Sequence, residues 1–187
     1  MRTRMQILLM AAAMLSIATA FRATTLARMS LDQLAAAADA VARVRCDSAG
    51  SQWENGAIWT VTTFDVVESM KGALPPQVTV RLPGGRVGHL TAAVDGTPKF
   101  SAGDEAVVFL ERSRAGGFSV AGWVEGTFRI TRDPRNGHET VTQDSSTFAV
   151  FDPATRVFRI EGVRRMPLEQ FRGRVAAAIA RTQEKTR

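Results

Sequence analysis

Disulfide-forming and metal-binding side chains are scarce in this chain. Its 187 residues include one cysteine and two histidines. A single cysteine excludes a disulfide-stapled scaffold and a zinc site built from several cysteines. Beyond the N-terminal segment, no stretch approaches the roughly 18 uninterrupted apolar residues of a membrane-spanning helix. With 45% apolar and 22% charged residues, the composition fits one folded domain and excludes a disordered tail, a collagen-like fibre and a polytopic membrane protein.

The first 20 residues have the pattern of a secretory signal peptide. Two arginines lie within the first four residues, residues 5–18 are mostly apolar, and Ala18-Thr19-Ala20 fits the small-x-small motif before a cleavage site. We therefore predict a cleaved signal peptide over residues 1–20 and a mature chain that begins at Phe21. The protein would then be extracytoplasmic, either periplasmic or secreted. An uncleaved anchor and a buried N-terminal helix are the alternatives.

Basic residues gather at the C-terminal end. The formal net charge is +6, and residues 164–187 hold seven basic and two acidic side chains. Within this segment Leu168, Phe171, Val175 and Ile179 follow a helical stripe. We predict a basic C-terminal helix with its charges on a solvated face. Nucleic acid is not expected as a partner, because the basic run contains a single aromatic residue and that residue is on the stripe. Weak contact with an anionic membrane surface is the alternative.

The mature chain begins with helix and strand signals. Ser30-Leu31-Asp32-Gln33 is a capping-box pattern, and it predicts a short helix over residues 31–39. Residues 41–46 alternate imperfectly and predict a strand, whereas the polar, glycine-containing residues 47–56 predict a loop. The longest strand is expected over residues 58–70. Its apolar phase slips, which predicts a bulge or a strong bend at Thr62-Thr63.

Further strand signals follow at close spacing. Residues 106–110 are continuously apolar, as in a central strand covered on both faces. Residues 139–160 predict a hairpin, which is either part of the domain or an insertion. The other strand predictions cover residues 78–82, 87–94, 118–124 and 127–131.

This pattern predicts a mainly β fold with flanking helices. The strongly bent early strand favours a small OB-like β-barrel over a β-sandwich, which is the alternative. The predicted organisation is a signal peptide (1–20), a segment with a short helix (21–40), the β-barrel domain (41–163) and the basic helix (164–187).

Three short motifs resemble one known superfamily. They are Val67-Glu68-Ser69-Met70-Lys71-Gly72, Val78-Thr79-Val80 followed by Leu82-Pro83-Gly84-Gly85, and Pro98-Lys99-Phe100-Ser101-Ala102-Gly103-Asp104-Glu105 leading into Val107-Val108-Phe109-Leu110. In this order they resemble the netrin-like OB domains, which include tissue inhibitors of metalloproteinases and bacterial secreted proteins of unknown function. The resemblance spans residues 41–130. It implies an OB fold and an extracytoplasmic binding module.

The inhibitory chemistry of that superfamily is not expected here. Those inhibitors present an N-terminal cysteine to a catalytic zinc ion and are stapled by disulfides. This chain is expected to begin at Phe21, and its one cysteine is Cys46. That mechanism is therefore not carried over to any residue of this chain.

Residues with catalytic or metal-binding chemistry are few and scattered. His89 and His138 lack the short spacing of a metal site, although Asp95, Glu139 or Asp144 would be possible third ligands. A free cysteine such as Cys46 is more often a small buried hydrophobic residue than a nucleophile. The glycine-rich run 82–88 lacks the Gly-Lys-Ser/Thr ending of a phosphate loop and predicts a turn. We therefore predict no catalytic residue, no metal and no cofactor.

An exposed tryptophan is the best binding candidate. Trp53 lies in a polar stretch, whereas Trp59 and Trp123 are expected in the core. We expect a loop surface around Trp53, Arg86 and His89 to bind an extracytoplasmic protein partner, so that the chain is a non-enzymatic interaction module. The alternatives are an envelope-associated accessory protein that docks through its basic C-terminal helix, and an unrecognised metal-dependent hydrolase.

Overall fold

The computed structural model describes residues 27–114, 116–147 and 149–185. The predicted signal peptide and Phe21 lie outside these residues. Strands make up 47% of the described residues, accompanied by a short helix and a C-terminal helix, which confirms the mainly β prediction. None of the described helices is long and apolar enough to cross a membrane.

The capping box builds the first helix as predicted. In α2 (Leu31–Ala37) the Ser30 hydroxyl accepts a hydrogen bond from the Gln33 backbone N–H, and the Gln33 side chain accepts one from the Ser30 N–H. The helix ends two residues before the predicted limit. Lys71 closes that end by donating from Nζ to the carbonyl oxygens of Ala35 and Ala38.

Five strands form a closed ring. The order is β1 (Ala40–Glu54), β2 (Ala57–Lys71), β3 (Gln77–Pro83), β7 (Phe118–Val120) and β6 (Glu105–Arg112), and β6 pairs back onto β1. This is the OB-like arrangement, although β3 and β7 meet at a single parallel pair, Val80 with Phe118, so the ring is not a clean barrel. The sheet continues from β6 through β8 (Thr127–Arg132), β9 (Glu139–Gln143) and β12 (Met166–Pro167).

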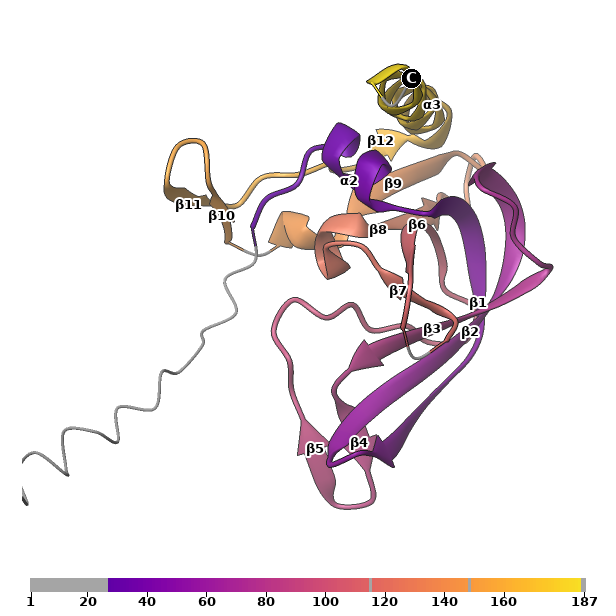
Figure 1. The fold of residues 1–187 in the computed structure, drawn as a ribbon. Helices are drawn as coiled ribbons and strands as arrows, with labels where there is room; N and C mark the ends of the chain where they lie inside the picture. The colour runs from indigo at the N-terminus through magenta and orange to yellow at the C-terminus, as the bar shows by residue number, and fades with distance from the viewer. Residues whose placement is uncertain (1–26, 115, 148, 186–187) are drawn as a thin grey trace, which may run out of the picture.

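The loop predicted over residues 47–56 is wrong. Strand β1 continues to Glu54, and the two-residue turn Asn55-Gly56 joins it to β2, with Glu54 paired to Ala57. Asn55 and Gly56 have φ angles of 49° and 81°, which is the geometry that Asn-Gly adopts in tight hairpins. Polar residues are tolerated here because this part of β1 is exposed to solvent. The β1–β2 hairpin therefore extends beyond the ring (Figure 1).

The bulge predicted at Thr62-Thr63 is also misplaced. The β2–β3 ladder runs through both threonines without a break, and Ile58, Thr62 and Phe64 are all buried on one face. Trp59, which was expected in the core, lies half-buried on the opposite face with the guanidinium of Arg81 5.5 Å from its ring centroid. The register shifts instead at three points of the β1–β2 pair nearer the ring.

Two small hairpins lie outside the main sheet. One consists of β4 (Gly85–Val87) and β5 (Leu90–Ala92), and the other of β10 (Val150–Asp152) and β11 (Val157–Arg159). Only the second half of the hairpin predicted at 139–160 is separate, because β9 belongs to the main sheet. The β10–β11 hairpin projects from the side of the molecule (Figure 1).

Strand β6 separates two apolar cores. Val107 and Phe109 face the first core, which α2 and α3 (Leu168–Lys185) cover. Ala106, Val108 and Leu110 face the second core, inside the ring. The prediction that residues 106–110 are covered on both faces is confirmed.

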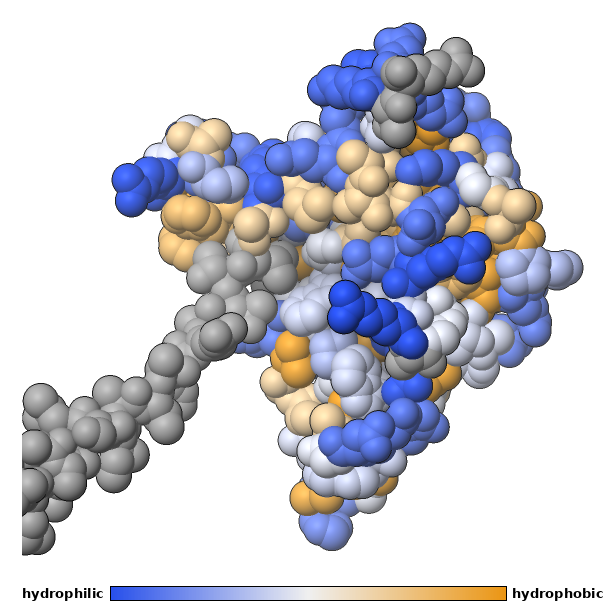
Figure 2. All heavy atoms as spheres, viewed as in Figure 1, coloured by the Kyte–Doolittle hydropathy of each residue, from blue (hydrophilic) through white to orange (hydrophobic). Residues whose placement is uncertain are grey.

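The apolar stripe of the C-terminal helix packs against the interior of the protein. Leu168, Phe171, Val175 and Ile179 are all buried, and the Phe171 ring lies 4.6 Å from that of Phe128. Hydrophilic side chains cover the outward side of this helix (Figure 2). The stripe is therefore part of the first core and is not available to a partner.

We expect Phe171→Ala to lower the free energy of unfolding by about 3–5 kcal/mol, because it opens a cavity between α3 and the sheet. Urea unfolding followed by circular dichroism measures the change. Gln170→Ala, at the exposed neighbouring position of the same helix, is the matched control and is expected to stay within about 0.5 kcal/mol of the parent. Equal losses in the two variants would contradict this role of the stripe.

Candidate binding site

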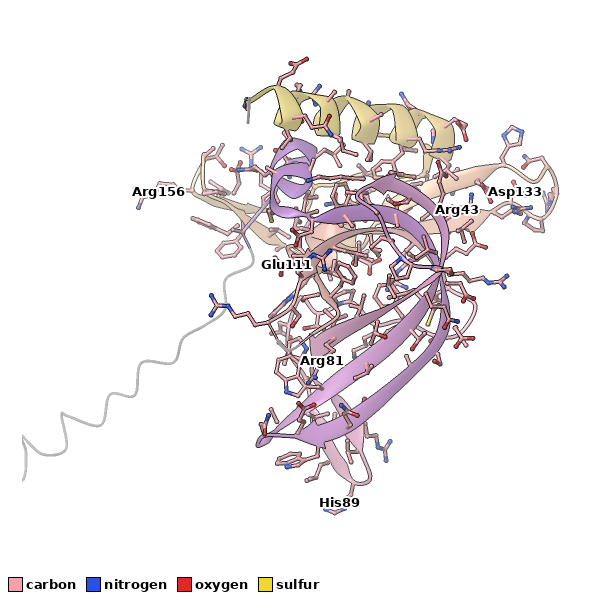
Figure 3. All side chains as sticks on the ribbon, turned by 45° about the vertical axis from the view of Figure 1, so that its right-hand side comes forward. Arg43, Arg81, His89, Glu111, Asp133 and Arg156 are labelled. Atoms are coloured by element: carbon pink, nitrogen blue, oxygen red, sulfur yellow. The ribbon has the colours of Figure 1, made fainter. Side chains whose placement is uncertain are left out.

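The residues proposed from the sequence lie at the end of the structure away from the two helices. We call this part the arm. It consists of the β1–β2 hairpin from Ser48 to Thr63, together with β4 and β5. Trp53 is near the end of β1 and Arg86 is in β4. His89, labelled in Figure 3, is in the turn between β4 and β5. Trp53 is 57% exposed, as expected, although it lies in a strand and not in a loop.

A chain of hydrogen bonds fixes β4 against the β1–β2 hairpin. The Thr60 hydroxyl donates to the Gly84 carbonyl oxygen at 2.7 Å, and Ser51 Oγ lies 3.0 Å from Thr60 Oγ1. Because the Thr60 proton is directed to the carbonyl, Ser51 donates to Thr60. The Arg86 backbone N–H then donates to Ser51 Oγ at 3.2 Å. The hydroxyl groups of Ser51 and Thr60 each have a defined donor and acceptor direction as a result.

The run 82–88, predicted as a turn, is mostly strand: β3 ends at Pro83, Gly84 alone separates the two strands, and β4 covers Gly85–Val87. The second glycine of the run, Gly85, is required for a steric reason. A Cβ atom at Gly85 would lie 2.1 Å from Ser51 Oγ and 2.5 Å from Thr60 Oγ1. The φ angle of Gly85 is also positive, at 132°, a conformation that glycine adopts readily. Only glycine therefore lets β4 lie directly on the two hydroxyls.

A cleft of about 490 Å³ lies beside this contact. One wall is the β1 segment Ala49, Gly50 and Ser51, with Thr60 beside it. The other wall is the returning chain between β5 and β6, which Phe100 anchors in the ring core by an edge-to-face contact with Phe64 at 4.8 Å. The cleft is therefore bounded by ordered strands on one side and a core-anchored segment on the other.

The cleft is lined mostly by small residues and by apolar surface, and three of its lining residues are charged. Charged lining residues are Arg86, Asp95 and Lys99. Thr97 also lines the cleft, and its hydroxyl has no hydrogen-bond partner among the described residues. The remaining lining residues are Pro83, Gly84, Gly85, Thr91, Ala92, Ala93, Val94, Gly96, Pro98 and Phe100. Such a surface suits small aliphatic groups with polar groups at the margin.

The residues at the ends of this site were predicted from the sequence, whereas those in its walls were not. Ser51 and Thr60 carried no functional signal of their own. Residues 87–94 were predicted as a strand and residues 95–98 as a turn, and neither prediction indicated a binding site. The available signal was Asn55-Gly56, the strongest short-range mark of a hairpin. It would have placed Trp53 and Ser51 on one strand facing Thr60.

A second cleft, of about 740 Å³, opens between the segment Arg28–Leu34 and residues 162–164. None of the three proposed binding residues lines it. It lies beside the β10–β11 hairpin, where Ala27 makes an isolated parallel bridge to Phe151.

Cys46 is buried, as the sequence analysis expected for a small hydrophobic residue. Burial raises the pKa of its thiol, and the nearby carboxylates of Asp104 and Asp47 raise it further. The reactive thiolate is disfavoured in this environment.

The two histidines lie at different parts of the molecule. His89 is at the end of the arm, whereas His138 directly precedes β9 in the segment that includes Asp133 (Figure 3). Among the residues that the structure describes, no group of three His, Cys, Asp or Glu side chains is arranged to hold a metal ion.

The first residues of β6 and β9, Glu105 and Glu139, make ion pairs within the sheet. Glu105 lies 2.6 Å and Glu139 2.9 Å from the Arg43 guanidinium, and Arg132 contacts Glu139 at 2.7 Å. Hydrogen bonding from Arg43, and secondarily from Arg132, lowers the pKa of Glu139 against the opposing effect of burial. These pairs join β1, β6, β8 and β9 across the sheet.

Arg129 fixes the segment that leads from the cleft into β6. It contacts Asp144 at 2.9 Å and Asp104 at 3.0 Å, and its guanidinium lies 4.2 Å from the Phe100 ring centroid. Burial raises the pKa of Asp144 although the Arg129 hydrogen bond opposes the shift. Asp104 and Glu105 thus both have structural partners.

A scan against models of known protein families and a search of curated proteins found no match to this chain. The netrin-like resemblance therefore remains a proposal, which rests on its three motifs and on the five-strand ring.

We expect Gly85→Ala to lower the free energy of unfolding by about 2 kcal/mol or more, because the methyl group collides with two hydroxyls at a positive φ. Gly88→Ala is the matched control: its φ is also positive, at 59°, but a Cβ there meets no atom within 4 Å. The control should cost only about 1 kcal/mol, the conformational part. Guanidinium unfolding of the two variants measures the difference, and equal losses would refute the close contact.

We expect Glu139→Gln to destabilise the protein at neutral pH and to have a smaller effect in acid. The folded-state pKa of Glu139 is below its ordinary value, so the stabilisation is present above the unfolded-state pKa and is lost as pH falls through the folded-state pKa. Urea unfolding over a pH series measures the gap between variant and parent. A gap that does not change with pH would contradict the ion-pair role. Glu184→Gln, at an exposed position of α3, provides the control.

Proposed function

We propose that this chain is an extracytoplasmic, non-enzymatic protein-binding module whose binding surface is the arm. The observation that carries the proposal is the position of Trp53, a largely exposed tryptophan at the end of β1, two residues from the cleft wall at Ser51. Tryptophan is among the side chains that contribute most to protein interfaces, because it buries a large area at a small entropic cost.

In this proposal the ring provides the folded core and the arm provides the binding surface. The ring contains the core that fixes the two long strands, and its buried cluster extends to Phe100 at the base of the cleft. The arm leaves the ring as a continuation of those same strands. A binding surface on strands is positioned more accurately than one on flexible loops.

Two further lines support the proposal. The N-terminal pattern of residues 1–20 supports export. The netrin-like resemblance, which implies an OB-like binding module, agrees with the closed order of β1, β2, β3, β7 and β6. OB-like folds host many functions, so the argument for binding rests on the arm and not on the fold.

Crosslinking tests this proposal. The chain from Phe21 to Arg187 serves as bait in an extract of envelope and culture fluid from its own source, followed by mass spectrometry. We expect one dominant protein partner, and we expect Trp53→Ala combined with Arg86→Ala to reduce its recovery by about tenfold or more, as loss of a central anchor residue does.

The chain offers a matched control pair. Phe158→Ala combined with Arg156→Ala removes an aromatic residue of nearly equal exposure, 58% against 57% for Trp53, and an arginine from the β10–β11 hairpin. Recovery of the partner should not change in this control. A partner lost equally from both double variants, or no partner above a mock bait, would refute the arm as the binding surface.

A further inference from the structure

The outer half of β1 has a neighbouring strand on one side only. Strand β6 pairs with β1 from Ala40 to Arg45. At the next residue, the Cys46 N–H donates to the Asp104 carbonyl and the Cys46 carbonyl accepts from the Gly103 N–H. From residue 48 to Glu54, the described strand that pairs with β1 is β2 alone. This half of β1 is therefore an open sheet edge.

The hairpin turn determines which backbone groups point to that edge. Glu54 and Ala57 flank a two-residue turn, so they form the hydrogen-bonded pair that closes the hairpin. Hydrogen-bonded and non-bonded pairs alternate in an antiparallel ladder. Ala49, Ser51 and Trp53 therefore direct both N–H and C=O away from β2, and among the described residues these groups have no backbone partner.

The same three residues face the cleft side of the arm. In the β1–β2 register Ala49, Ser51 and Trp53 lie opposite Thr62, Thr60 and Ile58. Cross-strand partners point to the same face of a sheet, and here that face is the one on which Thr60 and Ser51 contact Gly85. A strand added beside Ala49, Ser51 and Trp53 would therefore place every second side chain towards the cleft.

The geometry points to addition of an extended peptide from the protein partner along the open edge of β1. Its backbone would pair with Ala49, Ser51 and Trp53, a span of about 13 Å at the rise of a strand. Its alternate side chains would occupy the cleft and lie beneath the Trp53 indole. This inference rests on the proposed function and names the form that the partner presents.

The cleft indicates which peptide would fit. Its lining of glycine, alanine, proline and Val94 suits small aliphatic side chains, such as those of valine and alanine, at alternate positions. Residues between the aliphatic ones would face solvent and be polar.

A proline substitution tests the backbone pairing directly. Because the Ala49 N–H points away from β2, Ala49→Pro removes a donor that the hairpin does not use, whereas an added strand needs it. Ala49→Val is the matched control, because it keeps the N–H and adds a side chain of similar bulk. Circular dichroism and thermal unfolding check that both variants fold.

The probes are heptapeptides selected from a phage-displayed random library on the chain from Phe21 to Arg187. We expect enriched peptides with aliphatic residues at alternate positions. Their affinity, measured by fluorescence anisotropy, should fall about tenfold further in Ala49→Pro than in Ala49→Val, because both variants add bulk at the cleft wall and only proline removes the N–H. Absence of any enriched peptide, or equal affinity of the two variants, would overturn strand addition.

Amide hydrogen exchange of the unchanged protein gives a second measurement. In the free protein the amides of Ala49, Ser51 and Trp53 should exchange quickly, whereas those of Gly50 and Gln52 are protected by β2. Selected peptide should protect the first set alone. Protection elsewhere without protection of these three amides would overturn the proposal.

Two results would assign the open edge a different role. If the crosslinked partner is lost in the Trp53 and Arg86 double variant but is retained in Ala49→Pro, the arm binds protein by a route other than strand addition. If sedimentation shows that the unchanged chain forms a dimer that Ala49→Pro dissociates, the occupant of the edge is a second copy. Either result would overturn the addition of a partner peptide to β1. Only the first would still support the proposed function of the arm.

Discussion

The architecture depends on the burial of one short strand, β6, from every direction. Its edges are hydrogen-bonded to β1, to β7 and to β8, and its faces support two separate apolar cores. Five consecutive apolar residues, Ala106 to Leu110, satisfy both faces at once. Polar residues at these positions would leave one core without its wall, and neither the ring nor the helix layer would then have a surface to pack on.

Strand β1 connects the core around β6 to the proposed binding site on the arm. Its inner half closes the ring against β6, and its outer half continues as the arm, where β6 no longer accompanies it. The change occurs at the register shift between Cys46 and Ser48, where an extra residue in one strand alters the local twist. A single strand thus links the core to an unpaired edge, so the edge is held by the most buried part of the molecule.

The sequence predicted the elements whose signals are local. Ser30 and Gln33 form the capping box that their spacing indicated, the stripe that includes Phe171 is buried, and residues 106–110 form the central strand. The arm was not predicted because polarity was taken to indicate a loop. Solvent-exposed strands are polar too, and here pairing with β2 and the Asn55-Gly56 turn determine the structure. The cleft could not be predicted, because its walls come from segments that are far apart along the chain.

The order of the elements along the chain also affects when folding can finish. The first core is sealed by α3, which consists of Leu168–Lys185 at the end of the described residues. Phe109 and Phe128 therefore remain uncovered until α3 has left the ribosome, so this half of the core forms only after that helix has been synthesised.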